Sequence, residues 1–181
     1  MNVILLGYRG CGKSSVGRWL ADELRLEFVD LDVETCAAFG GRSVADIWAQ
    51  EGEPAFRAAE VAALKRVLAT DGQVIALGGG TPVQAGADAI LAAAPQAVRI
   101  YLRGAAETLA ARIAGDPASA ALRPSIGQSN SAAEEVAGVL AQREPVYERV
   151  SDLQIDVDDV SIEQVADAIC HTLTDGAWST P

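Results

Sequence analysis

The chain has 181 residues, half of them hydrophobic, which fits one domain with enough apolar material for a core. Its 25 acidic residues outnumber its 14 basic ones, and the net charge of −11 argues against nucleic-acid or anionic-membrane partners, because both need a basic face. Three cysteines without a CxxC pair argue against a disulfide framework or zinc site and favour a reducing compartment. We expect a soluble, cytoplasmic monomer with no membrane span.

Short aliphatic runs alternate with helical patterns along the chain. The continuous apolar run from Val3 to Leu6 predicts a strand covered on both faces, and weaker candidate strands lie at 27–29, 74–77, 98–102 and 153–157. Helical stripes lie between them: Val16, Leu20 and Leu24; Phe56, Leu64, Val67 and Leu68; Ile162, Val165, Ile169 and Leu173. Three capping-box pairs mark helix starts: Ser43 with Asp46, Ser131 with Glu134, and Ser161 with Gln164. The alternation predicts a single α/β domain with a parallel sheet and helices on both faces.

One segment breaks this alternation. Residues 115–130 are rich in Gly, Ala, Ser and Pro and have no clean period, and a loop of this length is usually a functional lid or disordered. Arg123 lies in this segment, where a mobile cation near bound phosphates could neutralise charge in a transition state. The alternative for Arg123 is a solvated loop arginine.

The residues from Gly7 to Ser14 read Gly-Tyr-Arg-Gly-Cys-Gly-Lys-Ser and match the phosphate-loop pattern GxxxxGK[ST]. An apolar strand precedes the loop and a helical stripe follows it, so backbone N–H groups and a helix N-terminus would surround phosphates. Lys13 would reach the β- and γ-phosphates and Ser14 would bind Mg²⁺. The alternative is a plain glycine turn. Because no Asn-Lys-x-Asp motif occurs, a GTPase is excluded and a small-molecule or nucleotide kinase is favoured.

Two acids, Asp30 and Asp32, close the second predicted strand. Side chains alternate along an extended segment, so both carboxylates are expected to point the same way at the carboxyl end of the sheet, where α/β folds bind ligands. One could hold Mg²⁺ through water and the other could face a substrate hydroxyl. The alternative is a helix N-cap beside a solvated acid.

Two arginines and a glycine run indicate a second binding region. Arg57 borders an apolar stripe, although a surface ion pair with Glu60 is the alternative. Arg143 falls within another apolar stripe, where a cation needs an anionic partner. That partner would be a bound anionic ligand or, alternatively, an acidic side chain in a buried structural salt bridge. The glycines from Gly78 to Gly80 would let the backbone approach a ligand closely, unless they form a loose turn.

Together these motifs resemble the shikimate kinase family of phosphate-loop kinases over roughly residues 2–170. Five elements occur in the family's order: Gly7 to Ser14, Asp30-x-Asp32, Phe56-Arg57-x-x-Glu60, Gly78 to Gly80, and Arg143-x-Pro145-x-Tyr147. The pair Arg123-Pro124 falls where the family places its lid pair. The resemblance implies a three-layer α/β/α fold with a five-stranded parallel sheet in order 2-3-1-4-5. It also implies a mobile lid at about 115–130 and a substrate-binding helical region at about 32–62.

The resemblance further implies transfer of the γ-phosphate of ATP to the 3-hydroxyl of shikimate, a step toward chorismate and the aromatic amino acids. The implied catalytic residues are Lys13, Asp32 and Arg123. The implied ATP-binding residues are Gly10, Cys11, Gly12, Lys13, Ser14, Ser15, Arg112, which stacks on adenine, and Arg123. The implied shikimate ligands are Arg57, Arg143 and Gly80 at the carboxylate, and Asp32 and Gly79 at the hydroxyls. One Mg²⁺ would be held by Ser14 and, through water, by Asp30.

Two other functions remain open from the residues alone. A pocket with arginines opposite a carboxylate and an acid opposite hydroxyls would also suit gluconate, so a sugar-acid kinase is the alternative enzyme. A nucleotide-binding regulatory module without turnover is the alternative of a different class. At 156–159 the chain reads Asp-Val-Asp-Asp, where many members of the resembling family offer a basic residue.

Overall fold

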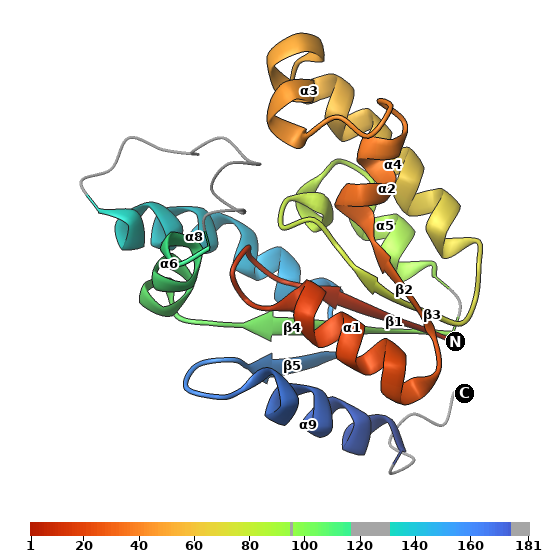
Figure 1. The fold of residues 1–181 in the computed structure, drawn as a ribbon, viewed down its shortest axis with the longest axis vertical. Helices are drawn as coiled ribbons and strands as arrows, with labels where there is room; N and C mark the ends of the chain where they lie inside the picture. Colours follow the sequence, from red (N-terminus) through yellow and green to blue (C-terminus); the bar gives the residue numbers. More distant parts are fainter. Residues whose placement is uncertain (95, 117–130, 175–181) are drawn as a thin grey trace.

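The computed structural model describes residues 1–94, 96–116 and 131–174. Five parallel strands form one sheet in the order β2-β3-β1-β4-β5, which confirms the predicted topology (Figure 1). The strands are β1 (Asn2–Leu6), β2 (Glu27–Asp30), β3 (Gln73–Ala76), β4 (Ala97–Arg103) and β5 (Leu153–Asp156). Most of the segment predicted to form a lid, including Arg123, lies outside the described residues.

Helices pack on both faces of the sheet, as predicted. They are α1 (Lys13–Leu24), α2 (Leu31–Ala37), α3 (Val44–Glu51), α4 (Glu53–Leu68), the short 3₁₀ helix η1 (Thr81–Val83), α5 (Ala87–Ala92), α6 (Ala106–Ala114), α8 (Ala132–Val150) and α9 (Ile162–Thr174). α1 and α9 cover one face, whereas α4, α5 and the C-terminal half of α8 cover the other.

Strand β1 lies at the centre of the core because all five of its side chains are buried. Val3 and Leu5 pack into the cluster that contains α1 and α9, and Ile4 and Leu6 pack into the cluster on the opposite face. This alternation explains why β1 reads as a continuous apolar run rather than as an amphipathic strand.

Three helix starts follow the predicted capping pairs. The Ser43 hydroxyl accepts a hydrogen bond from the backbone N–H of Asp46, and the Ser131 hydroxyl accepts one from Glu134. Ser161 and Gln164 bond reciprocally, which completes a capping box at the start of α9.

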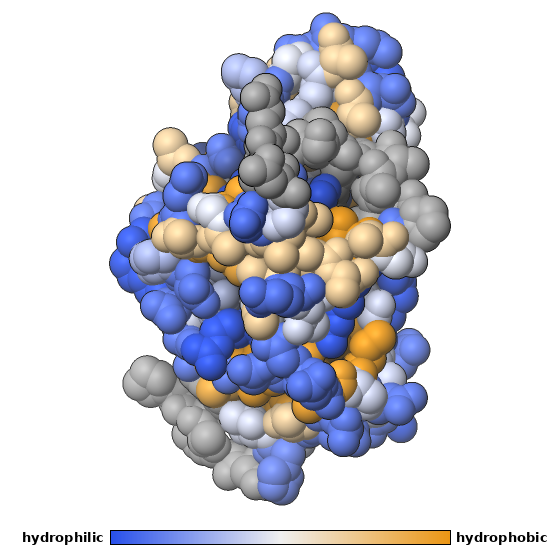
Figure 2. All heavy atoms as spheres, turned by 90° about the vertical axis from the view of Figure 1, so that its left-hand side faces the viewer, coloured by the Kyte–Doolittle hydropathy of each residue, from blue (hydrophilic) through white to orange (hydrophobic). Residues whose placement is uncertain are grey.

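Because the strands are parallel, their carboxyl ends share one edge of the sheet, and ligand sites of α/β folds lie at that edge. Figure 2 shows the side toward which β4 and β5 point in Figure 1, with a band of weakly hydrophobic residues between hydrophilic areas. Within the described ranges, no helix has both the length and the apolar character needed to cross a membrane.

Candidate active site

The phosphate loop connects β1 to α1 and has a backbone that depends on glycine. Gly7 has a φ of +141° and Gly12 a φ of +93°, values that side chains rarely allow. A Cβ at Gly7 would also lie 2.6 Å from the carbonyl oxygen of Leu102, so the loop packs directly against the end of β4. The loop therefore has the tight turn that the sequence pattern predicts.

Lys13 is the first residue of α1 and is only 9% exposed. Its Nζ donates hydrogen bonds to the carbonyl oxygens of Gly7, at 2.9 Å, and Tyr8, at 2.8 Å. The ammonium thus lies inside the curve of the loop and stabilises its shape.

A cavity of about 880 Å³ opens in front of this loop. Every described residue that we expect to contact ATP lines it: Gly10, Cys11, Gly12, Lys13, Ser14, Ser15 and Arg112. The acids Asp30 and Asp32 also line it. The cavity brings together the phosphate loop, both acids at the end of β2, and the predicted adenine-side arginine.

The Asp30-Leu-Asp32 segment differs from the prediction in its local structure. Strand β2 ends at Asp30, and α2 begins at Leu31, so Asp32 lies in a first helical turn rather than in an extended strand. Asp30 is the N-cap, because its Oδ1 accepts the backbone N–H of Asp32 at 3.1 Å. The alternation argument was therefore wrong, although both carboxylates do lie at the carboxyl edge of the sheet.

Asp30 makes a second contact in addition to the hydrogen bond of the N-cap. Its Oδ2 accepts a hydrogen bond from the Ser14 hydroxyl at 2.9 Å, so the two predicted Mg²⁺ ligands are in contact. A hydroxyl and a carboxylate are oxygen donors of the kind Mg²⁺ prefers. Within the described ranges, no cluster of three or more His, Cys, Asp or Glu side chains that could hold a metal ion occurs.

The loop after β5 lines the large cavity next to Arg112. Arg112 donates to the carbonyl oxygen of Val157 at 2.7 Å, and the Asp158 carboxylate accepts the backbone N–H of Ala105, just before α6, at 2.9 Å. Burial alone would raise the pKa of Asp158. This effect of burial is outweighed by hydrogen bonds from Thr108 and Ala105 and by the nearby charges of two arginines. The pKa of Asp158 is therefore lowered. The Asp158 carboxylate therefore links the loop after β5 to the start of α6.

We expect Asp158→Asn to destabilise the protein by about 1 kcal/mol at neutral pH, the value of an ordinary hydrogen bond. Because the folded-state pKa is lowered, this stabilisation is present above the usual carboxyl pKa and is lost as the pH falls through the folded value. Thermal melts of both proteins from pH 7 to pH 3 should therefore converge at the acidic end. A constant difference across this range would contradict the electrostatic explanation.

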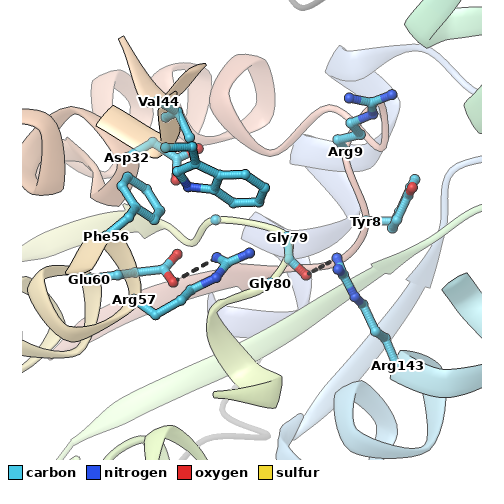
Figure 3. A pocket seen from close by; sticks show the side chains of 12 residues that line it. Tyr8, Arg9, Asp32, Val44, Phe56, Arg57, Glu60, Gly79, Gly80 and Arg143 are labelled. Carbon is cyan, nitrogen blue, oxygen red and sulfur yellow. Dashed lines mark hydrogen bonds and ion pairs between the residues drawn. The ribbon is translucent and has the colours of Figure 1, made fainter. Parts of the chain in front are cut away.

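A second, smaller cavity of about 60 Å³ adjoins the first. All the residues predicted to bind shikimate line it: Asp32, Arg57, Gly79, Gly80 and Arg143. Tyr8, Trp48 and Phe56 supply aromatic walls. The pocket is small and has cations and acids on its walls (Figure 3). It shares Asp32 with the larger cavity in front of the phosphate loop, which we call the nucleotide cavity.

Arg57 extends from α4 and is held by two acids. Its Nη1 lies 2.9 Å from Glu60 Oε2, and its Nη2 lies 3.1 Å from Glu53 Oε1. The expected alternative was a surface pair, but the Glu60 side chain is only 1% exposed and also accepts the Thr81 hydroxyl at 2.6 Å. The Arg57–Glu60 pair therefore forms part of the pocket wall (Figure 3). The spacing in Phe-Arg-x-x-Glu gave the pair, but nothing in it showed the burial of Glu60.

Arg143 extends from α8 on the other side of the pocket (Figure 3). Its Nη1 donates to the carbonyl oxygen of Gly79 at 3.1 Å, and the Tyr147 hydroxyl donates to the same oxygen. Burial raises the pKa of Tyr147 to about 12, so the phenol stays protonated and able to donate. Within the described ranges Arg143 makes no ion pair, so the structural salt bridge considered from the sequence is not found there.

The glycine loop after β3 permits close contacts rather than a loose turn. A Cβ at Gly80 would lie 2.9 Å from Arg57 Nη1, and a Cβ at Gly79 would lie 3.4 Å from the backbone nitrogen of Arg9. The loop therefore packs between the pocket arginine and the phosphate loop.

Several residues of the pocket, Trp48 and Arg9 among them, were not assigned to it from the sequence. The guanidinium carbon of Arg57 lies 5.2 Å from the ring centroid of Trp48, a cation–π distance. Arg9 lines both cavities, yet it occupies a variable position of the phosphate-loop pattern, which gave no signal for it.

A phosphate loop in front of a large cavity, beside a small pocket with arginines and an acid, defines a phosphate-loop kinase that acts on a small acceptor. Comparisons with known proteins agree with this class. The family model for shikimate kinase matches residues 9–174. The chain belongs to the shikimate kinase family.

Individual relatives cover nearly the whole chain. A shikimate kinase from Rhodopirellula baltica is 41% identical over 91% of this chain and 86% of its own length. A shikimate kinase from Stenotrophomonas maltophilia is 34% identical over 94% of this chain and 88% of its own. The solved structure of a shikimate kinase from Acinetobacter baumannii in complex with shikimate has a TM-score of 0.87 at 28% identity, covering 98% of this chain and 95% of that one.

Proposed function

We propose that this protein transfers the γ-phosphate of ATP to the 3-hydroxyl of shikimate, giving shikimate 3-phosphate and ADP. One observation carries the proposal: Asp32 lines both the phosphate-loop cavity and a small pocket with Arg57 and Arg143 on its walls. A hydroxyl acid bound there by its carboxylate would present a hydroxyl group at the boundary with the nucleotide. Family membership supports shikimate as that acid.

The two arginines are proposed to hold the shikimate carboxylate, together with Gly80. Arg57 and Arg143 come from different helices, and a carboxylate between them would accept charge-assisted hydrogen bonds from both. Gly79 and Asp32 are proposed to contact the hydroxyl groups. Trp48 and Phe56 are proposed to pack against the carbon ring.

In the proposed reaction the oxygen of the 3-hydroxyl attacks the γ-phosphorus. The bond between that phosphorus and the bridging oxygen of ADP breaks, and ADP keeps the electron pair. Asp32 orients the hydroxyl and accepts its proton, while Lys13 stabilises charge on the phosphate oxygens. In phosphoryl transfer, catalysis depends mostly on positioning and electrostatics, so this base need not be strong.

Ser14 and Asp30 are proposed to hold one Mg²⁺, with Asp30 acting through water. Their direct contact at 2.9 Å places two oxygen donors together at the phosphate loop. When bound, the ion neutralises phosphate charge and orients the nucleotide.

Residues at about 115–130, with Arg123, are proposed to close over ATP, and residues at about 32–62 to form the acceptor side. A cytoplasmic, monomeric enzyme is part of the same proposal, supported by the acidic composition and unpaired cysteines.

The direct test is an assay coupled to ADP release, with shikimate and gluconate supplied in parallel. We expect ADP release with shikimate and none above background with gluconate, with the phosphorylated product confirmed by ³¹P NMR. Turnover of gluconate instead would identify a sugar-acid kinase. Binding of ATP without turnover of either acid would identify a regulatory module.

Arg57→Lys and Arg143→Lys should each weaken shikimate binding by about 1.5–3 kcal/mol, because a lysine ammonium cannot copy the planar guanidinium fork. That corresponds to about a ten- to hundredfold higher Kd, measured by isothermal titration calorimetry. ATP affinity should change little, since neither residue lines the nucleotide cavity.

Arg99→Lys is a matched control. Arg99 pairs with Asp152 at 2.7 Å and lines neither cavity, so this variant should lose some stability and keep its shikimate affinity. If Arg57→Lys and Arg143→Lys behave like this control, both arginines have only a structural role.

A further inference from the structure

Arg9 occupies the boundary between the two cavities. Among the described residues that line them, Arg9 and Asp32 are the ones common to both. Lys13 lines only the nucleotide cavity, and Arg57 and Arg143 line only the acceptor pocket. Of these cations, Arg9 alone borders both the donor and the acceptor compartments.

The side chain of Arg9 has unused hydrogen-bonding capacity. Its Nε is buried and has no hydrogen-bond partner, and Arg9 forms no ion pair with any described residue. Arg57 and Arg99, by contrast, are each paired with carboxylates. A buried N–H donor without a partner is costly unless a ligand supplies the missing acceptor.

The backbone at Arg9 is fixed in place. Gly7 and Gly10, on either side, have φ values of +141° and +82°, and the main chain of Gly79 packs against the nitrogen of Arg9. Figure 3 shows Arg9 on the phosphate loop, on the other side of the pocket from Asp32 and Arg57. The cation is therefore anchored on a rigid loop.

We propose that Arg9 binds the phosphoryl group itself while it passes from ATP to the acceptor, and then the phosphate of the bound product. This inference rests on the proposed function. As the bond to ADP breaks and the bond to the acceptor oxygen forms, negative charge spreads over the equatorial oxygens of the phosphoryl group. Because Arg9 lines both cavities, its side chain can serve these oxygens on either side of the transfer, and the planar fork of its guanidinium suits them.

This assignment separates Arg9 from the other cations of the site. Arg57 and Arg143 would bind the acceptor carboxylate, which is the same before and after the reaction. Arg9 would bind the group that the reaction adds. Loss of Arg9 should therefore weaken binding of the phosphorylated product far more than binding of the unphosphorylated acceptor.

The test compares Arg9→Gln, Arg9→Lys and the control Arg149→Gln, which removes the same charge from an exposed pair with Asp88. Calorimetry gives the Kd of shikimate and of shikimate 3-phosphate for each protein. For Arg9→Gln we expect about a ten- to hundredfold weaker Kd for shikimate 3-phosphate and less than a threefold change for shikimate. Its kcat should fall by roughly a hundredfold, the lower end for one lost donor, with little change in the KM for shikimate.

Arg9→Lys keeps the charge and should recover part of the product affinity, while Arg149→Gln should match the parent. Equal weakening of shikimate and shikimate 3-phosphate by Arg9→Gln would overturn the proposal and make Arg9 a third carboxylate ligand. Unchanged affinity for both, with or without a lower melting temperature, would leave Arg9 a structural residue. If the parent protein itself fails to phosphorylate shikimate, the proposed function fails instead, so the two failures are distinguishable.

Discussion

Lys13→Ala should lower kcat by about a thousandfold, since its ammonium is placed to stabilise charge on the β- and γ-phosphate oxygens as the bond breaks. The structure adds a second effect. Lys13 also holds the carbonyl groups of Gly7 and Tyr8, so the variant leaves two acceptors inside the loop without their donor. ATP affinity should therefore fall as well, which steady-state kinetics and calorimetry would both show.

The chain supplies its own control, because Lys65 is the only other lysine. Lys65 is exposed on α4 and lines neither cavity, so Lys65→Ala should leave kcat and ATP affinity at the parent values. Near-normal turnover of Lys13→Ala would refute the role given to the phosphate loop.

Asp32→Asn should lower kcat by about a hundredfold to ten-thousandfold, the range for loss of a general base. Asparagine keeps the shape and a hydrogen-bonding group but removes the charge, so MgATP binding should survive. Shape matters here because a Cβ at Gly78 would lie only 2.6 Å from Asp32 Oδ1, which leaves little room for a larger side chain. Rapid-quench kinetics of the first turnover would isolate the chemical step.

Asp71→Asn removes the same charge from an exposed position beside the chain's N-terminus and should leave turnover unchanged. A large loss of MgATP affinity in Asp32→Asn, with shikimate affinity intact, would instead make Asp32 part of the metal site. Both ligands should thus be titrated against both variants.

The sheet could be predicted from the sequence because each strand carries a short aliphatic run and the runs alternate with helical stripes. The strand bounds differ from the prediction by one residue, at one end of β1, β2 and β5 and at both ends of β3 and β4. α2 was foreseen only in the alternative of a helix N-cap, because the pattern of alternating side chains around Asp30 also fits an extended segment. In the structure the Asp30 carboxylate caps a helix that begins at the next residue. The helix cap formed by the Asp30 side chain therefore determined the local structure, rather than the alternation of side chains expected for a strand.

The sequence predicted those residues of the candidate site that belong to recognisable motifs. Lys13, Ser14 and Asp30 lie together, as do Arg57 and Arg143, because each sits in a recognisable pattern at the carboxyl edge of the sheet. Glu60 and Arg9 were underestimated, since their importance comes from burial and from contacts across the fold. Neither burial nor contacts between distant parts of the chain can be predicted from the spacing of nearby residues.

The acceptor pocket takes its two arginines from two different helices that cover the same face of the sheet. Arg57 belongs to α4, on which α3 packs, and Arg143 belongs to α8. A small acid bound by both links these helices non-covalently, and a ligand that binds only the folded arrangement stabilises it by mass action. Amide hydrogen exchange in α3 and α4 should slow when shikimate binds, while β1, already at the centre of the core, should change least. Bound substrate would then act as a reversible cross-link between the two helices. The thermal stability of α3 and α4 would increase with the concentration of substrate.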